Sequence, residues 1–99
     1  MRQKSLEVEG LGHGVPIPMG CRVGPILATS AVGGKDPVSG KLPEDMDTQT
    51  AQAFRNLGAV LAAGGLGFGD VVKVTVYLLR EEDRDVVNKY WLMKRALTR

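Results

Sequence analysis

The sequence is poor in the residues that build metal and redox sites. Its 99 residues include one cysteine, Cys21, and one histidine, His13. A closed zinc site needs four ligands of these types, and a single cysteine cannot form a disulfide within its chain. We therefore expect no metal, no cofactor and no internal disulfide. Because the N-terminus also carries no apolar signal-peptide region, a cytoplasmic location is the expectation.

The sequence also has no long apolar run, no stripe of one charge and few aromatic residues. No apolar run approaches the ~20 residues that span a bilayer. Thirteen Lys and Arg residues are scattered among eleven carboxylates, which gives a net charge of +2, and only 5% of the residues are aromatic. Nucleic-acid binding usually needs a concentrated basic surface or an aromatic stacking platform. We expect neither a membrane role nor a nucleic-acid partner.

The length and composition are those of one small globular domain, spanning residues 1–99. Hydrophobic residues make up 43% and charged residues 24% of the chain, which is ordinary for a folded domain. A chain of this size buries only roughly 60 to 65% of its unfolded surface, so self-association would help to stabilise it.

Short strands and glycine-rich loops are expected in the first half of the chain. Alternation of apolar and charged residues predicts a strand over Leu6–Glu9, and four glycines and two prolines predict a loop over Gly10–Gly20. Residues 21–23 and 26–32 are expected to form two strands joined by a turn at Gly24-Pro25. A turn-rich surface loop should follow over residues 33–43.

A helix over Asp47–Ala63 is the strongest local prediction. Apolar residues at helical spacing include Phe54 and Leu61, and Gly64-Gly65 is a typical helix stop. Asp45 and Asp47 are both suitable N-caps, and either carboxylate would also meet the positive end of the helix dipole.

The next segments indicate a strand and a second helix. A strand over Val71–Leu79 would place four aliphatic residues on one face, and a mixed row containing Lys73, Thr75 and Tyr77 on the other. The mixed row suggests a surface that meets another subunit or a site. An acidic first turn at Glu81–Asp83 then begins a helix that runs to Arg99.

Each candidate reactive side chain can be interpreted as a structural residue as well as a chemical one. His13 lies between two glycines and could act as a general base, although the sequence shows no carboxylate to orient it. Ser30 has no evident His or Asp partner, so it is read as a hydroxyl that hydrogen-bonds a ligand or water. Lys73 is expected to reach solvent or to pair with a carboxylate, instead of acting as a nucleophile. Cys21 is expected to be a small buried residue.

Several runs, taken in order and spacing, resemble one family over a nearly ungapped stretch from about Pro16 to Asn88. These runs are Arg22-Val23-Gly24, Ala28-Thr29-Ser30, the loop Asp36 to Pro43, the helix from Gln49 through Asn56-Leu57 to Gly64, Gly69 to Tyr77, and Val87-Asn88. The family is the Rid family of reactive intermediate deaminases, also called YjgF.

The resemblance implies an α+β domain of the chorismate-mutase-like type, with two helices on one face of a mixed sheet and assembly as a homotrimer. Sites in this family lie in clefts between subunits. Members hydrolyse enamine and imine products of amino-acid dehydratases to 2-keto acids and ammonia. An arginine binds the substrate carboxylate, and a glutamate or a bound water assists.

The resemblance also assigns site residues. Ser30 matches the family's hydroxyl in the cleft and is the catalytic candidate, while Ala31 matches a glycine that faces the ligand and Asn88 matches an asparagine near it. Ile17 stands where the deaminating branch usually has tyrosine, and Ala31-Val32 replace the usual Gly-Gln.

The family's C-terminal strands, with their arginine and glutamate, have no counterpart before Arg99, and Arg99 is not equated with the substrate-binding arginine. We expect a domain incomplete at its C-terminus, with an unpaired sheet edge.

The sequence therefore indicates a Rid-like deaminase acting on 2-aminoacrylate or 2-iminobutanoate type intermediates. A chain with weak activity, or with none, is also consistent with the sequence. The alternative is a homo-oligomer that binds small metabolites, or acts as a chaperone, without catalysis. Ribonuclease activity, which appears among the names attached to this family, is disfavoured because the sequence shows no basic groove and no pair of acid-base residues.

Overall fold

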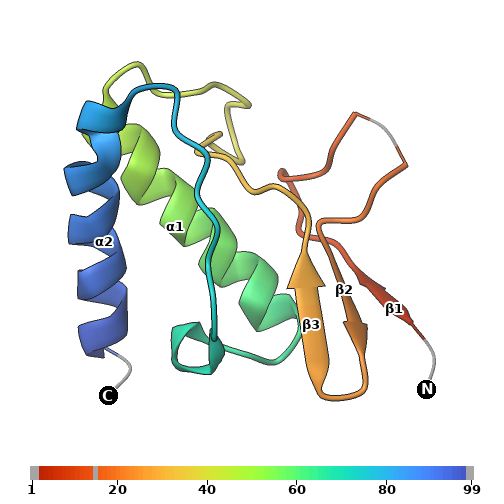
Figure 1. Ribbon diagram of the computed structural model, residues 1–99. Coiled ribbons are helices and arrows are strands. Elements are labelled where there is room, and N and C mark those ends of the chain that lie inside the picture. The colour runs from red at the N-terminus through yellow and green to blue at the C-terminus, as the bar shows by residue number, and fades with distance from the viewer. Residues whose placement is uncertain (1–2, 15, 98–99) are drawn as a thin grey trace.

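The computed structural model describes residues 3–14 and 16–97. Three short strands form one antiparallel sheet in the order β1-β2-β3, and two helices follow (Figure 1). The strands are β1 (Lys4–Leu6), β2 (Gly20–Val23) and β3 (Ile26–Thr29), and the helices are α1 (Met46–Ala63) and α2 (Arg84–Leu97). Two short 3-10 turns, η1 (Phe68–Asp70) and η2 (Glu81–Asp83), lie between the helices. The predicted α+β class is confirmed, and every described strand pair is antiparallel.

The hairpin of β2 and β3 lies where the sequence predicted it, but the strands are shorter. Val23 pairs with Ile26 across a turn whose Gly24 has φ of 56°, a conformation that glycine adopts easily. β3 ends at Thr29, so residues 30–32 are not strand. The prediction of a strand over Leu6–Glu9 was wrong by several residues. β1 is Lys4–Leu6, because its register pairs Leu6 with Gly20 and the chain then turns away.

Helix α1 begins and ends close to the predicted residues. The Asp45 carboxylate is the N-cap and accepts hydrogen bonds from the N–H and the hydroxyl of Thr48, both at 2.9 Å. The helix ends at Gly64, and Gly65 follows with φ of 78°. The Arg22 guanidinium donates hydrogen bonds to the Gly64 carbonyl and to the Gly24 carbonyl. This cation from β2 therefore satisfies an orphan carbonyl at the negative end of α1.

The second half of α1 packs on the sheet at close range. Val60 is fully buried, and a Cβ added at Gly20 of β2 would lie 3.2 Å from a Val60 methyl carbon. A Cβ at Gly64 would come within 2.1 Å of the Leu27 side chain. Leu11 and Met19 complete this cluster from the loop between β1 and β2. Small residues at these contacts let the helix and the sheet approach each other.

Helix α2 packs beside α1. In the view of Figure 1, α1 lies between α2 and the sheet. Phe54 of α1 lies between two aromatic neighbours, with ring centroids 6.3 Å from Phe68 and 6.4 Å from Trp91. These distances are typical of favourable aromatic pairs. None of the helices in the described part of the chain is long and apolar enough to cross a bilayer.

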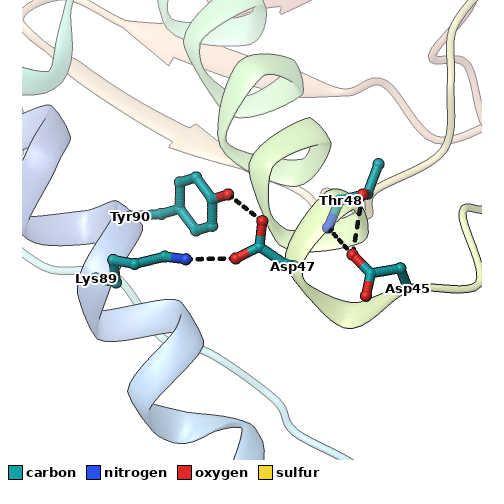
Figure 2. Close-up of polar contacts among 5 residues, drawn as sticks. All are labelled: Asp45, Asp47, Thr48, Lys89 and Tyr90. Atoms are coloured by element: carbon teal, nitrogen blue, oxygen red, sulfur yellow. Dashed lines mark hydrogen bonds and ion pairs between the residues drawn. The ribbon is translucent and has the colours of Figure 1, made fainter.

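A polar cluster joins the start of α1 to α2 (Figure 2). The Asp47 carboxylate pairs with the Lys89 ammonium and accepts a hydrogen bond from the Tyr90 hydroxyl at 2.6 Å. Both hydrogen bonds lower the pKa of Asp47, the Lys89 bond more, and the Asp47 carboxylate in turn raises the pKa of Lys89 and of Tyr90. Of the two predicted N-caps, Asp45 therefore caps the helix, while Asp47 links the two helices.

The prediction of a strand over Val71–Leu79 was wrong for the described chain. The segment is extended but pairs with none of the described strands. In the aliphatic row that was expected to be buried, Val72 is 99% exposed and Val76 46% exposed, whereas Val74 and Leu78 are half-buried, so the row is only partly covered. A strand needs a hydrogen-bonded neighbour as well as β-branched residues, and this segment has no such neighbour among the described residues.

Candidate functional site

Ser30, which directly follows β3, is held by three hydrogen-bond contacts, two of which involve its hydroxyl. The Ser30 N–H donates to the Met19 carbonyl at 3.0 Å, and the Ser30 hydroxyl lies 3.2 Å from the same oxygen. The third contact joins Ser30 Oγ to His13 Nε2 at 2.7 Å. Met19 is buried, so the backbone that holds Ser30 is itself held by the core.

The contact with His13 was missed by the sequence analysis, which found no histidine partner for Ser30. The loop between β1 and β2 folds back and brings His13 to a residue 17 positions further along the chain. The two glycines that flank His13 were the available signal, because they allow a backbone path that returns to the sheet. A hydroxyl and an imidazole at this distance can pass a proton between them, since either group can be the donor.

A small pocket of about 120 Å³ lies beside this pair. Its lining includes His13, Met19, Ala31, Val32, Lys35 and Asn56. The pocket therefore contains the predicted substrate-binding residue Ala31 and lies next to the predicted catalytic residue Ser30. Lys35 is half-buried as a residue, and its ammonium makes no hydrogen bond or ion pair with the described part of the chain.

The loop that forms one wall of the pocket is held by Asn56 of α1. This side chain is 2% exposed, and its amide donates to the carbonyls of Gly33 and Lys35, at 2.8 Å in each case. Its amide oxygen accepts from Gln52 at 2.8 Å. Gly34 lies between the two bonded carbonyls, and a Cβ there would come within 2.2 Å of the Gln49 carbonyl oxygen. The loop therefore runs against α1 with no room for a side chain.

Asn88, the other polar site residue predicted from the resemblance, lies in a different place. It lines a larger and more open pocket of about 430 Å³, together with Val76, Leu78, Glu81, Arg84 and Val87. In this pocket the Arg84 guanidinium lies 3.0 Å from the Glu81 carboxylate. Within one chain, the structure does not bring Asn88 into the pocket that contains Ala31.

The remaining candidates are set apart from both pockets. Ile17 is 52% exposed and is not among the residues that line either one. Lys73 is exposed, as expected, whereas Cys21 is half-buried in β2 instead of fully buried. Arg99 lies outside the described residues. No group of three or more metal-ligating side chains gathers within residues 3–14 and 16–97.

Comparison with known proteins identifies the family. Residues 18–94 match the family model described as Endoribonuclease L-PSP. The chain is 36% identical over 73 residues to a 2-iminobutanoate/2-iminopropanoate deaminase of Salmonella typhimurium, covering 74% of this chain and 57% of the relative. A mouse protein of the same description is 42% identical over 59 residues, covering 59% of this chain and 44% of that protein. The chain thus spans about half the length of these curated relatives.

Solved structures agree with the sequence match. RidA from the Antarctic bacterium Psychrobacter sp. PAMC 21119 superposes with a TM-score of 0.86 at 26% identity, over 92% of this chain and 75% of that one. The YjgF gene product of E. coli gives a TM-score of 0.83 at 28% identity, over 92% and 76% of the two chains. TdcF of E. coli, solved with bound serine, gives 0.85 at 27% identity, over 91% and 72%. By sequence and by fold, the chain belongs to the Endoribonuclease L-PSP family, the Rid or YjgF family that its motifs resemble.

Proposed function

We propose that the chain is a Rid-type deaminase, which hydrolyses imine or enamine intermediates such as 2-iminobutanoate and 2-aminoacrylate to 2-keto acids and ammonia. The observation that carries this proposal is the Ser30 hydroxyl, held beside a small pocket that also contains Ala31. Relatives described as 2-iminobutanoate/2-iminopropanoate deaminases match the chain at 34 to 36% identity over 73 residues. The free Cys21 thiol suits a reducing compartment, and we propose a cytoplasmic location.

In the proposed reaction, Ser30 and nearby backbone groups orient a water molecule toward the imine carbon. The hydroxyl suits this role because its hydrogen bond to the carbonyl of the buried Met19 holds it in place. Little conformational entropy of the Ser30 side chain is therefore lost when water binds. No metal or cofactor is required, because hydrolysis of an imine consumes only water.

We further propose that residues 1–99 form one domain that assembles as a homotrimer, with substrate sites between subunits. Two features support this assembly. Apolar side chains of the segment 71–79 are open to solvent, with Tyr77 89% exposed in addition to Val72 and Leu79, and large exposed apolar patches mark contact surfaces. Asn88 and Ala31 also line separate pockets within one chain. Contact between copies would let one site use both.

The test is an assay with 2-aminoacrylate that a dehydratase generates in place from serine. We expect the purified chain to accelerate pyruvate release above the rate in buffer, and no acceleration would contradict the proposal. Light scattering coupled to size exclusion tests the assembly. A mass near three times 10.6 kDa is expected, and a stable monomer at micromolar concentration would contradict the trimer.

A non-enzymatic role in binding small metabolites, or a chaperone-like role, is the second candidate. Two observations favour this role. Ile17 cannot form the hydrogen bond of the tyrosine that the resemblance places at this position. The guanidinium of Arg84, which lines the larger pocket, is paired with Glu81 and is therefore less available to bind a substrate carboxylate. Binding of 2-oxobutanoate that raises the melting temperature, with no turnover of the imine, would support this role over the enzyme. Ribonuclease activity is not proposed, since a net charge of +2 gives little attraction for a phosphate backbone.

A further inference from the structure

The pocket beside Ala31 holds two side chains whose chemistry fits a complete hydrolysis of a small imino acid. We propose that His13, acting with Ser30, transfers the protons of the reaction, and that Lys35 binds the substrate carboxylate. This inference rests on the proposed deaminase function and specifies the residues that would perform it. It gives catalytic and binding roles to His13 and Lys35, neither of which the family resemblance identified as a site residue.

The position of His13 carries the first half of the inference. Its Nε2 atom is 2.7 Å from Ser30 Oγ, and the ring also lines the pocket, so it contacts both the hydroxyl and the space for substrate. The ring is half-buried, which limits competition from bulk water. The Ser30 hydroxyl can donate a hydrogen bond either to the Met19 carbonyl or to the imidazole, and only the imidazole can take up its proton. A hydroxyl with two alternative acceptors can relay a proton without moving its oxygen.

Lys35 carries the second half. It lines the same pocket from the loop that Asn56 holds against α1, and its ammonium has no partner within the described part of the chain. A cation that lacks an internal carboxylate partner, on a loop whose backbone is held, is suited to bind an anionic ligand. The family's substrate arginine has no described counterpart in this pocket, and Lys35 is the only lysine or arginine in the described lining.

The part of the site that one chain forms is small. About 120 Å³ corresponds to roughly four water molecules at ~30 Å³ each. This space suits an imino acid of three or four carbons and is well below the 300 Å³ or more that is common for larger ligands. We therefore place the short-chain imino acid of the proposed function in this pocket, with its carboxylate at Lys35 and its imine carbon near Ser30.

The protons balance through the His13–Ser30 pair. As water oxygen bonds to the imine carbon, a water proton passes to Ser30 and the Ser30 proton passes to His13 Nε2, while the C=N electron pair moves onto nitrogen. The imidazolium returns that proton to nitrogen. His13 then takes the proton of the new hydroxyl as the C=O bond forms and the C–N bond breaks, and gives it to the leaving nitrogen. One water is consumed, one ammonia is released, and nothing is oxidised.

The charges around His13 are few. Lys35 is the only other ionisable side chain in the described lining. The Glu7 carboxylate lies nearby, where it accepts a hydrogen bond from the Met19 N–H at 3.3 Å.

The test measures kcat and KM from pH 5 to 9 for the wild-type chain, His13→Gln, Ser30→Ala and Lys35→Met. We expect His13→Gln to lower kcat by about 100-fold or more and to abolish the fall in rate on the acid side. Lys35→Met should raise KM by about tenfold with a smaller change in kcat. Lys41→Met is the matched control, because Lys41 is exposed on the same surface loop and should leave both constants unchanged.

The outcomes separate the inference from the function on which it rests. If the wild-type chain is active but His13→Gln keeps its kcat and its acid limb, the proton-transfer role is wrong and the deaminase function stands. If Lys35→Met changes KM no more than Lys41→Met does, the carboxylate role is wrong. An inactive wild-type chain would overturn the deaminase function and this inference together. Unchanged thermal melting shows that each variant is folded.

Nuclear magnetic resonance gives an independent readout, because His13 is the only histidine in the chain. Titration with 2-oxobutanoate, the product-like keto acid, should shift the His13 ring protons in the wild type and in Lys41→Met. The shift should require about tenfold more ligand in Lys35→Met. Ring protons that stay unchanged at saturating keto acid would show that the ligand binds elsewhere, which would overturn the inference.

Discussion

The face of α1 that carries Val60 and the segment 71–79 are both rich in aliphatic residues, but they differ in what covers them. Val60 is fully buried against β2 and the loop that carries Met19. Val72 and Leu79 are almost fully exposed, and their segment pairs with none of the described strands. Apolar composition alone therefore does not decide burial. Each region takes the structure that its neighbours allow.

The same comparison separates stability from function. The Val60 region fixes Met19, whose carbonyl holds Ser30, so packing of the core positions the candidate catalytic group. The segment 71–79 contributes Val76 and Leu78 to the pocket of Asn88 and leaves the rest of its apolar surface for contact. The first region builds the pocket of one chain, and the second offers a surface on which a site shared between chains could form.

Replacing a valine by alanine in each of the two regions should give the largest difference in the free energy of unfolding. Val60→Ala removes two buried methyl groups and leaves a cavity, so we expect a loss of about 2 kcal/mol in the free energy of unfolding. Val72→Ala should change it by less than about 0.5 kcal/mol in the monomer. Urea unfolding measures both. Equal losses in a monomeric sample would mean that the segment 71–79 is packed in solution.

Asparagine provides a second pair. Asn56→Ala leaves the carbonyls of Gly33 and Lys35 without their donor, and we expect a loss of about 1 to 3 kcal/mol. The exposed Asn88 should tolerate alanine with little change in the free energy of unfolding. Asn56→Ala should also weaken keto-acid binding, because the loop with Lys35 loses its anchor. A stable Asn56→Ala chain with normal binding would show that the loop is held by other contacts.

Threonine gives a smaller effect of the opposite sign. Thr50 is buried in α1, and its hydroxyl has no hydrogen-bond partner among the described residues. Thr50→Val removes this unsatisfied group, and we expect a gain of up to about 1 kcal/mol in the free energy of unfolding. Thr75→Val, in the exposed segment, is the control and should be near neutral. Destabilisation by Thr50→Val would indicate that a bound water satisfies the hydroxyl.

The smallest effect is expected at the cluster of Asp47, Lys89 and Tyr90 (Figure 2). The pKa of Asp47 is lowered from 3.8 by its hydrogen bonds to Lys89 and Tyr90, so its stabilisation is present above about pH 4 and is lost as the pH falls through the lowered pKa. The pKa values of Lys89 and Tyr90 are raised from 10.5 and 10.0, so their share is present below about pH 10 and is lost at higher pH.

Asp47→Asn should therefore lower the melting temperature slightly and evenly between about pH 5 and 9. The difference from the wild type should shrink at both extremes. Asp85→Asn, an exposed carboxylate in the first turn of α2, is the control. A difference between wild type and Asp47→Asn that persists at pH 2 would show that the charge of Asp47 is not what stabilises the contact.

Local signals predicted the parts of the fold that depend on local physics. Helical spacing and the Gly64-Gly65 stop placed α1 within one residue, and Gly24-Pro25 placed the hairpin turn. The choice between Asp45 and Asp47 as N-cap could not be made from the sequence, because it depends on Lys89 and Tyr90 of the other helix. The segment 71–79 failed as a strand for a similar reason, since pairing depends on a partner far along the chain.

The candidate site shows the same limit. Ser30 and Ala31, which are adjacent in the sequence, were predicted from the family resemblance; Ala31 lines the small pocket and Ser30 contacts His13 of its lining. His13 was considered only as a loop histidine, because its contact with Ser30 depends on the path of a glycine-rich loop. Lys35 was not considered, because nothing in its sequence neighbourhood distinguishes it from other surface lysines. Its position follows from the buried amide of Asn56, which holds the loop.

The most direct test of the account is the rate of pyruvate formation from 2-aminoacrylate with the purified wild-type chain and with His13→Gln. We expect the wild-type chain to accelerate hydrolysis and His13→Gln, with the same melting temperature, to lose most of that acceleration. A wild-type rate equal to the rate in buffer would contradict the proposed function. Equal acceleration by both chains would contradict the role of His13 and of the pocket beside Ala31.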